Sequence, residues 1–128
     1  MRLLLDTTVL IDVLRMRGRR PQLLAELIRA GHTLSTSAVN TAEVYAGVRP
    51  QEEAATELFL GALECHPITR AAARRAGTMK RDWSRKGRTL TLADTLVAAV
   101  ALENDCHVVA DNGRDFPMPE VKRYSLPE

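Results

Sequence analysis

Acidic residues follow two apolar segments of this sequence, at the points where both segments end. Asp6 directly follows the apolar run at 3–5, Asp111 directly follows the run at 107–110, and Asp115 lies shortly after it. Apolar runs of this length are typical of buried strands in a parallel sheet. Because ligands bind beyond the carboxyl ends of such strands, we expect these three acids to share one edge of the sheet.

Two further acids, Glu43 and Asp94, lie in the first turns of expected helices. Helices that follow strands begin at the same edge, although this placement is less direct for Asp94, whose helix precedes a strand. Several carboxylates at one edge repel each other and raise their own pKa values. A hard divalent cation removes that conflict, since it prefers oxygen ligands. Such an ion activates water and stabilises charge on phosphoryl oxygens, which favours phosphodiester hydrolysis.

Each acid also has a purely structural interpretation. Asp6 is of a type favoured as a helix N-cap. Glu43 follows Asn40 by three residues, which fits a capping box. Asp94 follows Thr91 by three residues, and an acid in a first turn suits the helix dipole. Only the joint placement of the acids favours a site.

The elements that must hold these acids alternate along the chain. Strands are expected near 3–5, 32–36, 65–68, 107–110 and 122–126, and helices near 9–14, 22–30, 37–47, 51–63, 69–86 and 91–103, with a break at 17–21. Alternating strands and helices predict an α/β fold with three layers, a central mostly parallel sheet between helices. The 128 residues suit a single domain, 1–128.

Charge and composition narrow the possible partners. The net charge is only +2, but eight basic residues between Arg70 and Arg88 accompany one acid, Asp82. Such a segment attracts a polyanion, although a solvated helix face is an equal alternative. Aromatic residues make up 4% of the chain, which argues against a base-stacking platform.

Two cysteine–histidine pairs, Cys65–His66 and Cys106–His107, invite a zinc interpretation. Neighbours in a strand point to opposite faces, so one pair cannot easily supply two ligands, and buried cysteines in strands are favoured instead. No disulfide framework is expected. No signal peptide or membrane-spanning segment is evident, so we expect a cytoplasmic protein without a membrane partner.

Four segments match a known pattern in order and spacing. They read LLDTTVLID at 4–12, SAVNTAEVYAGV at 37–48, LADTLVAAVA at 92–101 and HVVADNGRDF at 107–116. Each is loose singly, but together they resemble the PIN-domain ribonucleases, and within them the VapC-type toxins of VapBC toxin–antitoxin pairs. The resemblance covers nearly the whole chain, from residue 3 to about residue 116.

The resemblance implies a site as well as a fold. It implies Mg²⁺ or Mn²⁺ held by Asp6, Glu43 and Asp94, with a fourth acid near the end of the strand at 107–110. It also implies that Thr8 lies close to the site and holds a ligand or a water.

The fourth acid is where this sequence departs from the family. Relatives often carry Thr where Ala110 stands, and their acid falls where this chain has Asn112. Asp111 and Asp115 flank that position. We expect Asp115, which matches the Asp-Phe ending of the motif, to be the fourth ligand, with Asp111 second.

The resemblance further implies an activity and partners. Similar proteins are homodimeric endonucleases that cut structured RNA such as tRNA or ribosomal RNA, leaving a 5′-phosphate and a 3′-hydroxyl. A VapB-like antitoxin neutralises them, and its C-terminal segment covers the active site, often with an arginine. The basic segment 70–88 would then position the RNA backbone.

Other classes of function remain open on the residues alone. A PIN-like module without catalysis would bind RNA or protein, and the retained acids argue against it. A metal-dependent phosphatase of the haloacid-dehalogenase type needs a second Asp two residues after Asp6, where Thr8 stands. A receiver-type signalling domain needs paired acids after the first strand, and these are missing.

Overall fold

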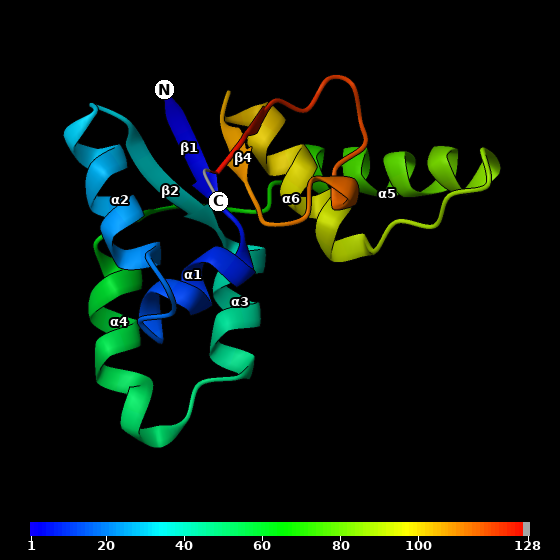
Figure 1. Cartoon of the computed structure of the whole chain (residues 1–128). Helices are drawn as coiled ribbons and strands as arrows, with labels where there is room; N and C mark the ends of the chain where they lie inside the picture. The colour runs from blue at the N-terminus through cyan, green and yellow to red at the C-terminus, as the bar shows by residue number, and fades with distance from the viewer. Residues whose placement is uncertain (127–128) are drawn as a thin grey trace.

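The computed structural model describes residues 1–126, which form one parallel sheet with helices on both faces (Figure 1). The strands are β1 (Arg2–Leu5), β2 (Thr33–Ser37), β3 (Glu64–His66), β4 (His107–Val109) and β5 (Arg123–Tyr124). The α-helices are α1 (Thr7–Leu14), α2 (Arg20–Arg29), α3 (Ala38–Ala46), α4 (Glu53–Gly61), α5 (Arg70–Arg85) and α6 (Leu92–Glu103). Two short 3₁₀ helices, η1 (Pro50–Glu52) and η2 (Gly113–Asp115), complete the described chain.

The order of the strands is β3-β2-β1-β4-β5, and every pair is parallel. From β1 the chain crosses to β2 and β3 on one side, and later to β4 and β5 on the other. This reversal places a topological switch point between the carboxyl ends of β1 and β4, where open α/β sheets bind ligands. Leu5 is in register with Val109, and the backbone N–H of Asp6 donates to the Val109 carbonyl at 2.9 Å.

The apolar run of β1 is buried on both faces of the sheet. Leu4 packs with α5 and α6, whereas Leu3 and Leu5 pack with α1, α2 and α4. All three leucines are 0% exposed, and burying each contributes about 1.5–3 kcal/mol. A strand that is apolar at successive positions can satisfy both faces only between two layers of helices, so the expected three-layer α/β fold is confirmed.

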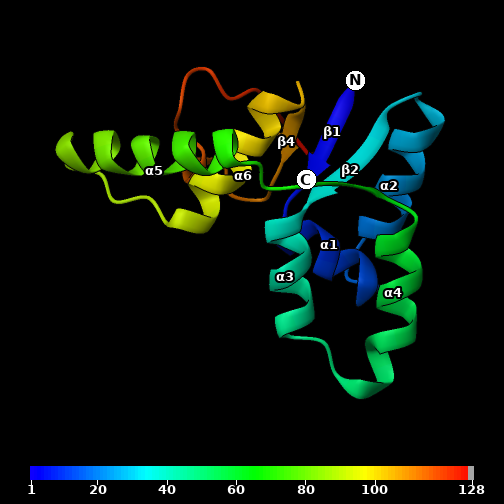
Figure 2. The ribbon, with the colours of Figure 1, turned by 180° about the vertical axis from the view of Figure 1, so that it is seen from behind.

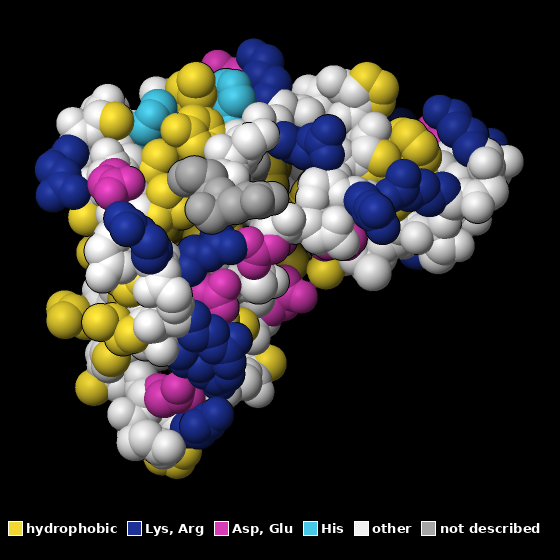
Figure 3. Space-filling model, in the orientation of Figure 1, with side chains coloured by type: hydrophobic (Ala, Val, Ile, Leu, Met, Phe, Trp, Pro, Cys, Tyr) yellow, Lys and Arg dark blue, Asp and Glu magenta, His cyan; other side chains and the backbone are white. Residues whose placement is uncertain are grey.

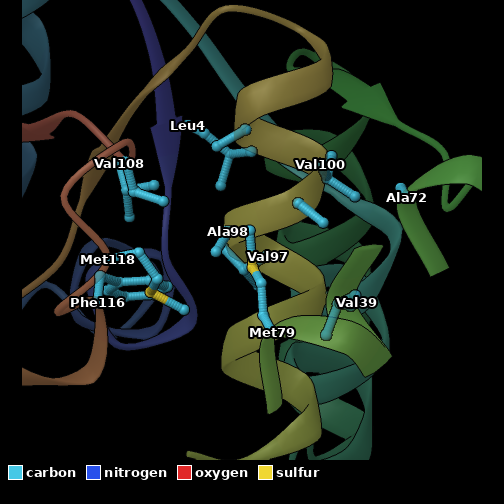
Figure 4. Packing of buried hydrophobic residues seen from close by; sticks show 14 of the residues in the cluster. Leu4, Val39, Ala72, Met79, Val97, Ala98, Val100, Val108, Phe116 and Met118 are labelled. Atoms are coloured by element: carbon cyan, nitrogen blue, oxygen red, sulfur yellow. The ribbon is translucent and has the colours of Figure 1, made fainter. Parts of the chain in front are cut away.

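Helix α6 lies between the sheet and α5 (Figure 4). Consecutive side chains are buried, and they are Val97, Ala98, Ala99, Val100 and Ala101. A helix that is apolar all round needs cover on several sides, and small alanines allow close approach. Its start is fixed by Thr91, whose Oγ1 accepts a hydrogen bond from the backbone N–H of Asp94 at 3.1 Å. This cap determines where the Asp94 carboxylate emerges.

The helices form two groups. In both views, α1 to α4 lie on one side of the molecule, and α5 and α6 lie on the other (Figures 1 and 2). Helix α2 begins at Arg20, earlier than the sequence pattern predicts, because Pro21 occupies its first turn, where the missing N–H costs nothing. Within residues 1–126, no helix combines the length and the apolar character needed to cross a bilayer.

Candidate functional site

Asp6 lies at the switch point, directly after β1. It takes the N-cap position of α1, but its side chain makes no capping hydrogen bond. Instead, the Asn40 side-chain amide donates to Asp6 Oδ1 at 2.9 Å. The N-cap interpretation is therefore right for the backbone position and wrong for the carboxylate, which points to α3.

A polar chain leads from α3 back to α1. Ser37 Oγ donates to Asn40 Oδ1 at 2.6 Å, and the amide of Asn40 donates to Thr7 Oγ1 at 3.0 Å. Thr7 Oγ1 in turn donates to Glu43 Oε1 at 2.7 Å. Since the Asn40 amide also donates to Asp6, these hydrogen bonds together fix the orientations of the amide and of the Glu43 carboxylate relative to each other.

The N-cap of α3 is Ser37, whose Oγ accepts from the Asn40 N–H at 3.3 Å. The capping-box interpretation of Glu43 with Asn40 is therefore wrong, since Asn40 already lies inside the helix. Asn40 and Ser37 are both fully buried. Buried polar groups require partners, and here those partners belong to the acidic site.

Four carboxylates from four segments lie near one another. The pKa of Asp6 rises from 3.8 to about 6, chiefly because its carboxyl group is buried; the charges of Asp94 and Glu43 also raise it, whereas hydrogen bonds from the Thr7 backbone and Asn40 lower it. Burial also raises the pKa of Asp94, helped by the charges of Asp115 and Glu43 and opposed by Thr91. The mutual repulsion expected from the sequence is therefore present, and we call Asp6, Glu43, Asp94 and Asp115 the acidic cluster.

Asp111 interacts with an arginine and not with the acidic cluster. Its carboxylate forms an ion pair with Arg20, whose Nε also lies 3.6 Å from an oxygen of Asp12. Asp115, by contrast, ends η2 and lies close enough to raise the pKa of Asp94. Of the two expected candidates for a fourth ligand, the structure brings Asp115 to the other acids and pairs Asp111 with an arginine.

The acidic cluster is not an assembled set of metal ligands. Within residues 1–126, no three acidic, histidine or cysteine side chains converge closely enough to hold one ion. Acidic side chains gather where the two groups of helices meet, with basic side chains beside them (Figure 3). The candidate ligand atoms are all carboxylate oxygens, and burial raises the pKa of Asp6 and of Asp94, which is the chemistry that fits a hard divalent cation.

Sequence reasoning missed Thr7 and Asn40. Thr8, which the family resemblance favours, is exposed, and its side chain makes no hydrogen bond within the described residues. A usable signal was present, because Ser37, Asn40 and Glu43 recur at intervals of three. That spacing places them along one face of a helix.

The prediction of buried cysteines in strands is met in full by neither residue, because Cys106 directly precedes β4 and Cys65, although in β3, is not buried. Cys106 is buried, but Cys65 is exposed on β3, an edge strand with little cover. The two Cys–His pairs contact each other, since the Cys106 sulfur lies 3.7 Å from His66 Nε2. This contact lies within the core and supplies no third ligand, so it does not restore the zinc interpretation.

Comparison with known proteins identifies the family. The family model described as "PIN domain" matches residues 3–121. Ribonuclease VapC19 from Mycobacterium tuberculosis is 37% identical over 115 residues, which cover 90% of this chain and 92% of the relative. Ribonuclease VapC10 from the same organism is 35% identical over 119 residues, with coverage of 92% and 88%.

Comparison with solved structures agrees with the fold. A crystal structure of VapBC2 from Rickettsia felis, bound to a DNA fragment from its promoter, contains a chain that superimposes with a TM-score of 0.85. The superposition covers 99% of this chain and 100% of that chain, at 20% sequence identity. Matching of nearly the full length in sequence and in structure leaves one conclusion: the chain belongs to the PIN-domain family and, within it, to the VapC group.

Proposed function

We propose that this chain is a metal-dependent ribonuclease and the toxin of a VapBC toxin–antitoxin pair. One observation carries the chemistry. Asp6, Glu43, Asp94 and Asp115 come from separate segments near the switch point, and burial of Asp6, together with the charges of Asp94 and Glu43, raises its pKa to about 6. The kinship with proteins named ribonucleases supports the choice of RNA as the substrate.

The residues that would hold Mg²⁺ or Mn²⁺ are Asp6, Glu43 and Asp94, with Asp115 as the fourth acid. When bound, the ion supplies a water of lowered pKa and neutralises charge on the scissile phosphate. The Asn40 amide donates to one oxygen of Asp6 and so orients this carboxylate. Because the carboxylates do not yet converge, the proposal requires their side chains to draw together around the cation.

Thr7 has a positioning role in this proposal. Its hydroxyl accepts from Asn40, which also donates to Asp6, and it donates to Glu43, so it connects the partners of these two carboxylates. Such partners of ligating groups orient them and raise metal affinity. Thr8, exposed one residue further on, stays a predicted contact for substrate or water.

Helix α5 is the proposed contact for the RNA backbone. Four arginines lie along its solvent face, opposite the buried stripe of Ala72, Ala76 and Met79, and they are Arg70, Arg74, Arg81 and Arg85. Only Arg81 has an acidic partner among the described residues, exposed Asp82 at 3.4 Å. Their charges remain available to phosphates, and a straight row of this kind suits the regular backbone of structured RNA such as tRNA or ribosomal RNA.

The proposed protein partners follow from the family. The VapC-group relatives and the VapBC2 structure support a VapB-like antitoxin that binds this chain and blocks its site. A homodimer is proposed on the same kinship. Light scattering after size-exclusion chromatography, with and without a co-expressed antitoxin, measures both assemblies.

The deciding experiment is cleavage of total cellular RNA by the purified chain in Mg²⁺ or Mn²⁺. An Asp94→Asn variant removes one charge from the acidic cluster while keeping the Thr91 cap. Asp105→Asn is the matched control, because Asp105 is an exposed aspartate just beyond the same helix. Its φ of 52° is one that Asn adopts readily.

We expect discrete fragments with 5′-phosphate ends from the unaltered chain and from Asp105→Asn. EDTA and Asp94→Asn should abolish them, and sequencing of the new 5′ ends would identify the RNA. Cleavage that persists in EDTA would contradict metal dependence. A folded chain that neither cleaves RNA nor binds Mn²⁺ would instead be a PIN-like binding module.

A further inference from the structure

The segment between β4 and β5 carries Asp115, and three arginines from distant parts of the chain contact it. Arg20 comes from α2, Arg88 from the turn after α5, and Arg123 from β5. The segment itself contains only the three-residue helix η2. One turn of 3₁₀ helix has little stability of its own, so outside contacts must fix it.

Each arginine contacts a different part of the segment. Arg20 donates to the carboxylate of Asp111, and Arg88 donates to the backbone carbonyl of Arg114. Arg123 Nη1 donates to the carbonyl of Gly113 at 2.6 Å. Three successive anchor points therefore lie in the five residues that end at Asp115.

Gly113 shows that the contact with Arg123 needs a bare backbone. A Cβ at position 113 would lie 2.5 Å from Arg123 Nη1 and 3.4 Å from its Cζ. No real side chain fits at that distance, so the guanidinium would have to swing away. Since it is the far end of a flexible side chain, Gly113→Ala should remove this contact without disturbing the core.

We propose that Arg20, Arg88 and Arg123 form an arginine clamp that positions Asp115 opposite Asp94. The capped helix α6 fixes one side of the acidic cluster, and the clamp fixes the other. The three arginines are positioning residues, because they contact the backbone or Asp111 and not the reacting atoms. The role of Asp115 as a ligand rests on the proposed function, whereas the hold of the clamp on the segment does not.

The placement of the clamp also explains the ion pair of Asp111. A guanidinium that holds Asp111 keeps a fifth carboxylate out of the acidic cluster, whose charge is already unfavourable. Arg20 shares its charge between Asp111 and Asp12, so it fastens the segment to both α1 and α2. The segment is thereby tied to both groups of helices, since Arg88 follows α5.

The test uses the full chain without metal and then with Mn²⁺. Hydrogen–deuterium exchange over residues 110–118 measures the hold on the segment, and calorimetry measures the affinity for Mn²⁺. Arg123→Ala and Gly113→Ala remove the same anchor in two ways: the first deletes the guanidinium, and the second displaces it from the Gly113 carbonyl. Arg123→Lys keeps a positively charged donor for the Gly113 carbonyl but loses the planar guanidinium. Arg29→Ala, at the exposed end of α2, is the control for loss of an arginine.

We expect both anchor-removing variants to speed exchange over 110–118 in the metal-free chain and to leave exchange in α6 unchanged. Their Mn²⁺ affinity should fall about 10-fold, as for other groups that orient metal ligands. In cleavage, kcat should fall and KM for RNA should not. Arg123→Lys should restore part of each loss, and Arg29→Ala should change nothing.

Unchanged exchange in both variants would overturn the clamp. A rise in KM alone, without faster exchange, would also overturn it, because these arginines would then contact RNA phosphates. Failure of the proposed function has a different signature. The unaltered chain would bind no Mn²⁺ and cleave no RNA, while the exchange measurement would still decide whether the clamp holds the segment.

Discussion

Asp6→Asn replaces a carboxylate of the acidic cluster by a neutral group of the same shape. The pKa of Asp6 rises from 3.8 to about 6 on folding. One pKa unit corresponds to about 1.4 kcal/mol, so an ionised Asp6 destabilises the metal-free fold by about 3 kcal/mol. An asparagine oxygen can still accept the amide of Asn40, and the variant therefore avoids this cost.

The sign of the pH dependence follows from the direction of the shift. A raised pKa means that the folded chain holds the proton more tightly than the unfolded chain. The stability from Asp6 is thus fully present below pH about 4 and is lost as the pH rises through about 6. We expect Asp6→Asn to exceed the unaltered chain by about 3 kcal/mol at pH 8, and by about half of that at pH 5.

Urea unfolding in EDTA at pH 5 and pH 8 measures this difference. Asp105→Asn makes the same charge change at an exposed position and should show no such dependence. In saturating Mn²⁺ at pH 8 the order should reverse, because only the unaltered chain gains the full binding energy of the ion. Equal stability of Asp6→Asn and the unaltered chain at both pH values would refute the electrostatic reasoning.

Three further predictions concern the roles of single side chains. Asp115→Asn should weaken Mn²⁺ binding about 10-fold or more, as titration calorimetry would measure. Asp111→Asn should mainly lower the unfolding temperature in a thermal melt, because it breaks the ion pair with Arg20. Thr7→Val should reduce cleavage with little change in RNA affinity, since its hydroxyl links two helices of the site. Replacing both Arg81 and Arg85 by Glu should weaken RNA binding, and most strongly at low salt. RNA titrations at several salt concentrations measure this effect, and unchanged binding would show that α5 does not contact the RNA.

The sequence by itself determined the layers of the fold and the edge that carries the acids. A run of three leucines can be a strand only if both of its faces are covered, and β1 is indeed buried on both faces. Periodic apolar segments between such strands must supply the cover. Once the sheet is parallel, residues that follow β1 and β4 meet at the same edge, so Asp6 and the segment at 111–115 were bound to be neighbours.

Tertiary structure alone decided which polar groups pair at that edge. Thr7 and Thr8 are equivalent as sequence, but the rotation of α1 against α3 turns only the Thr7 hydroxyl toward Glu43. Likewise, Asp111 is adjacent to the motif in sequence, yet Arg20, 91 residues away, takes its carboxylate. Local propensity fixes where a helix or strand begins, whereas a hydrogen bond depends on how elements distant in sequence approach each other, and packing of the whole core sets that approach.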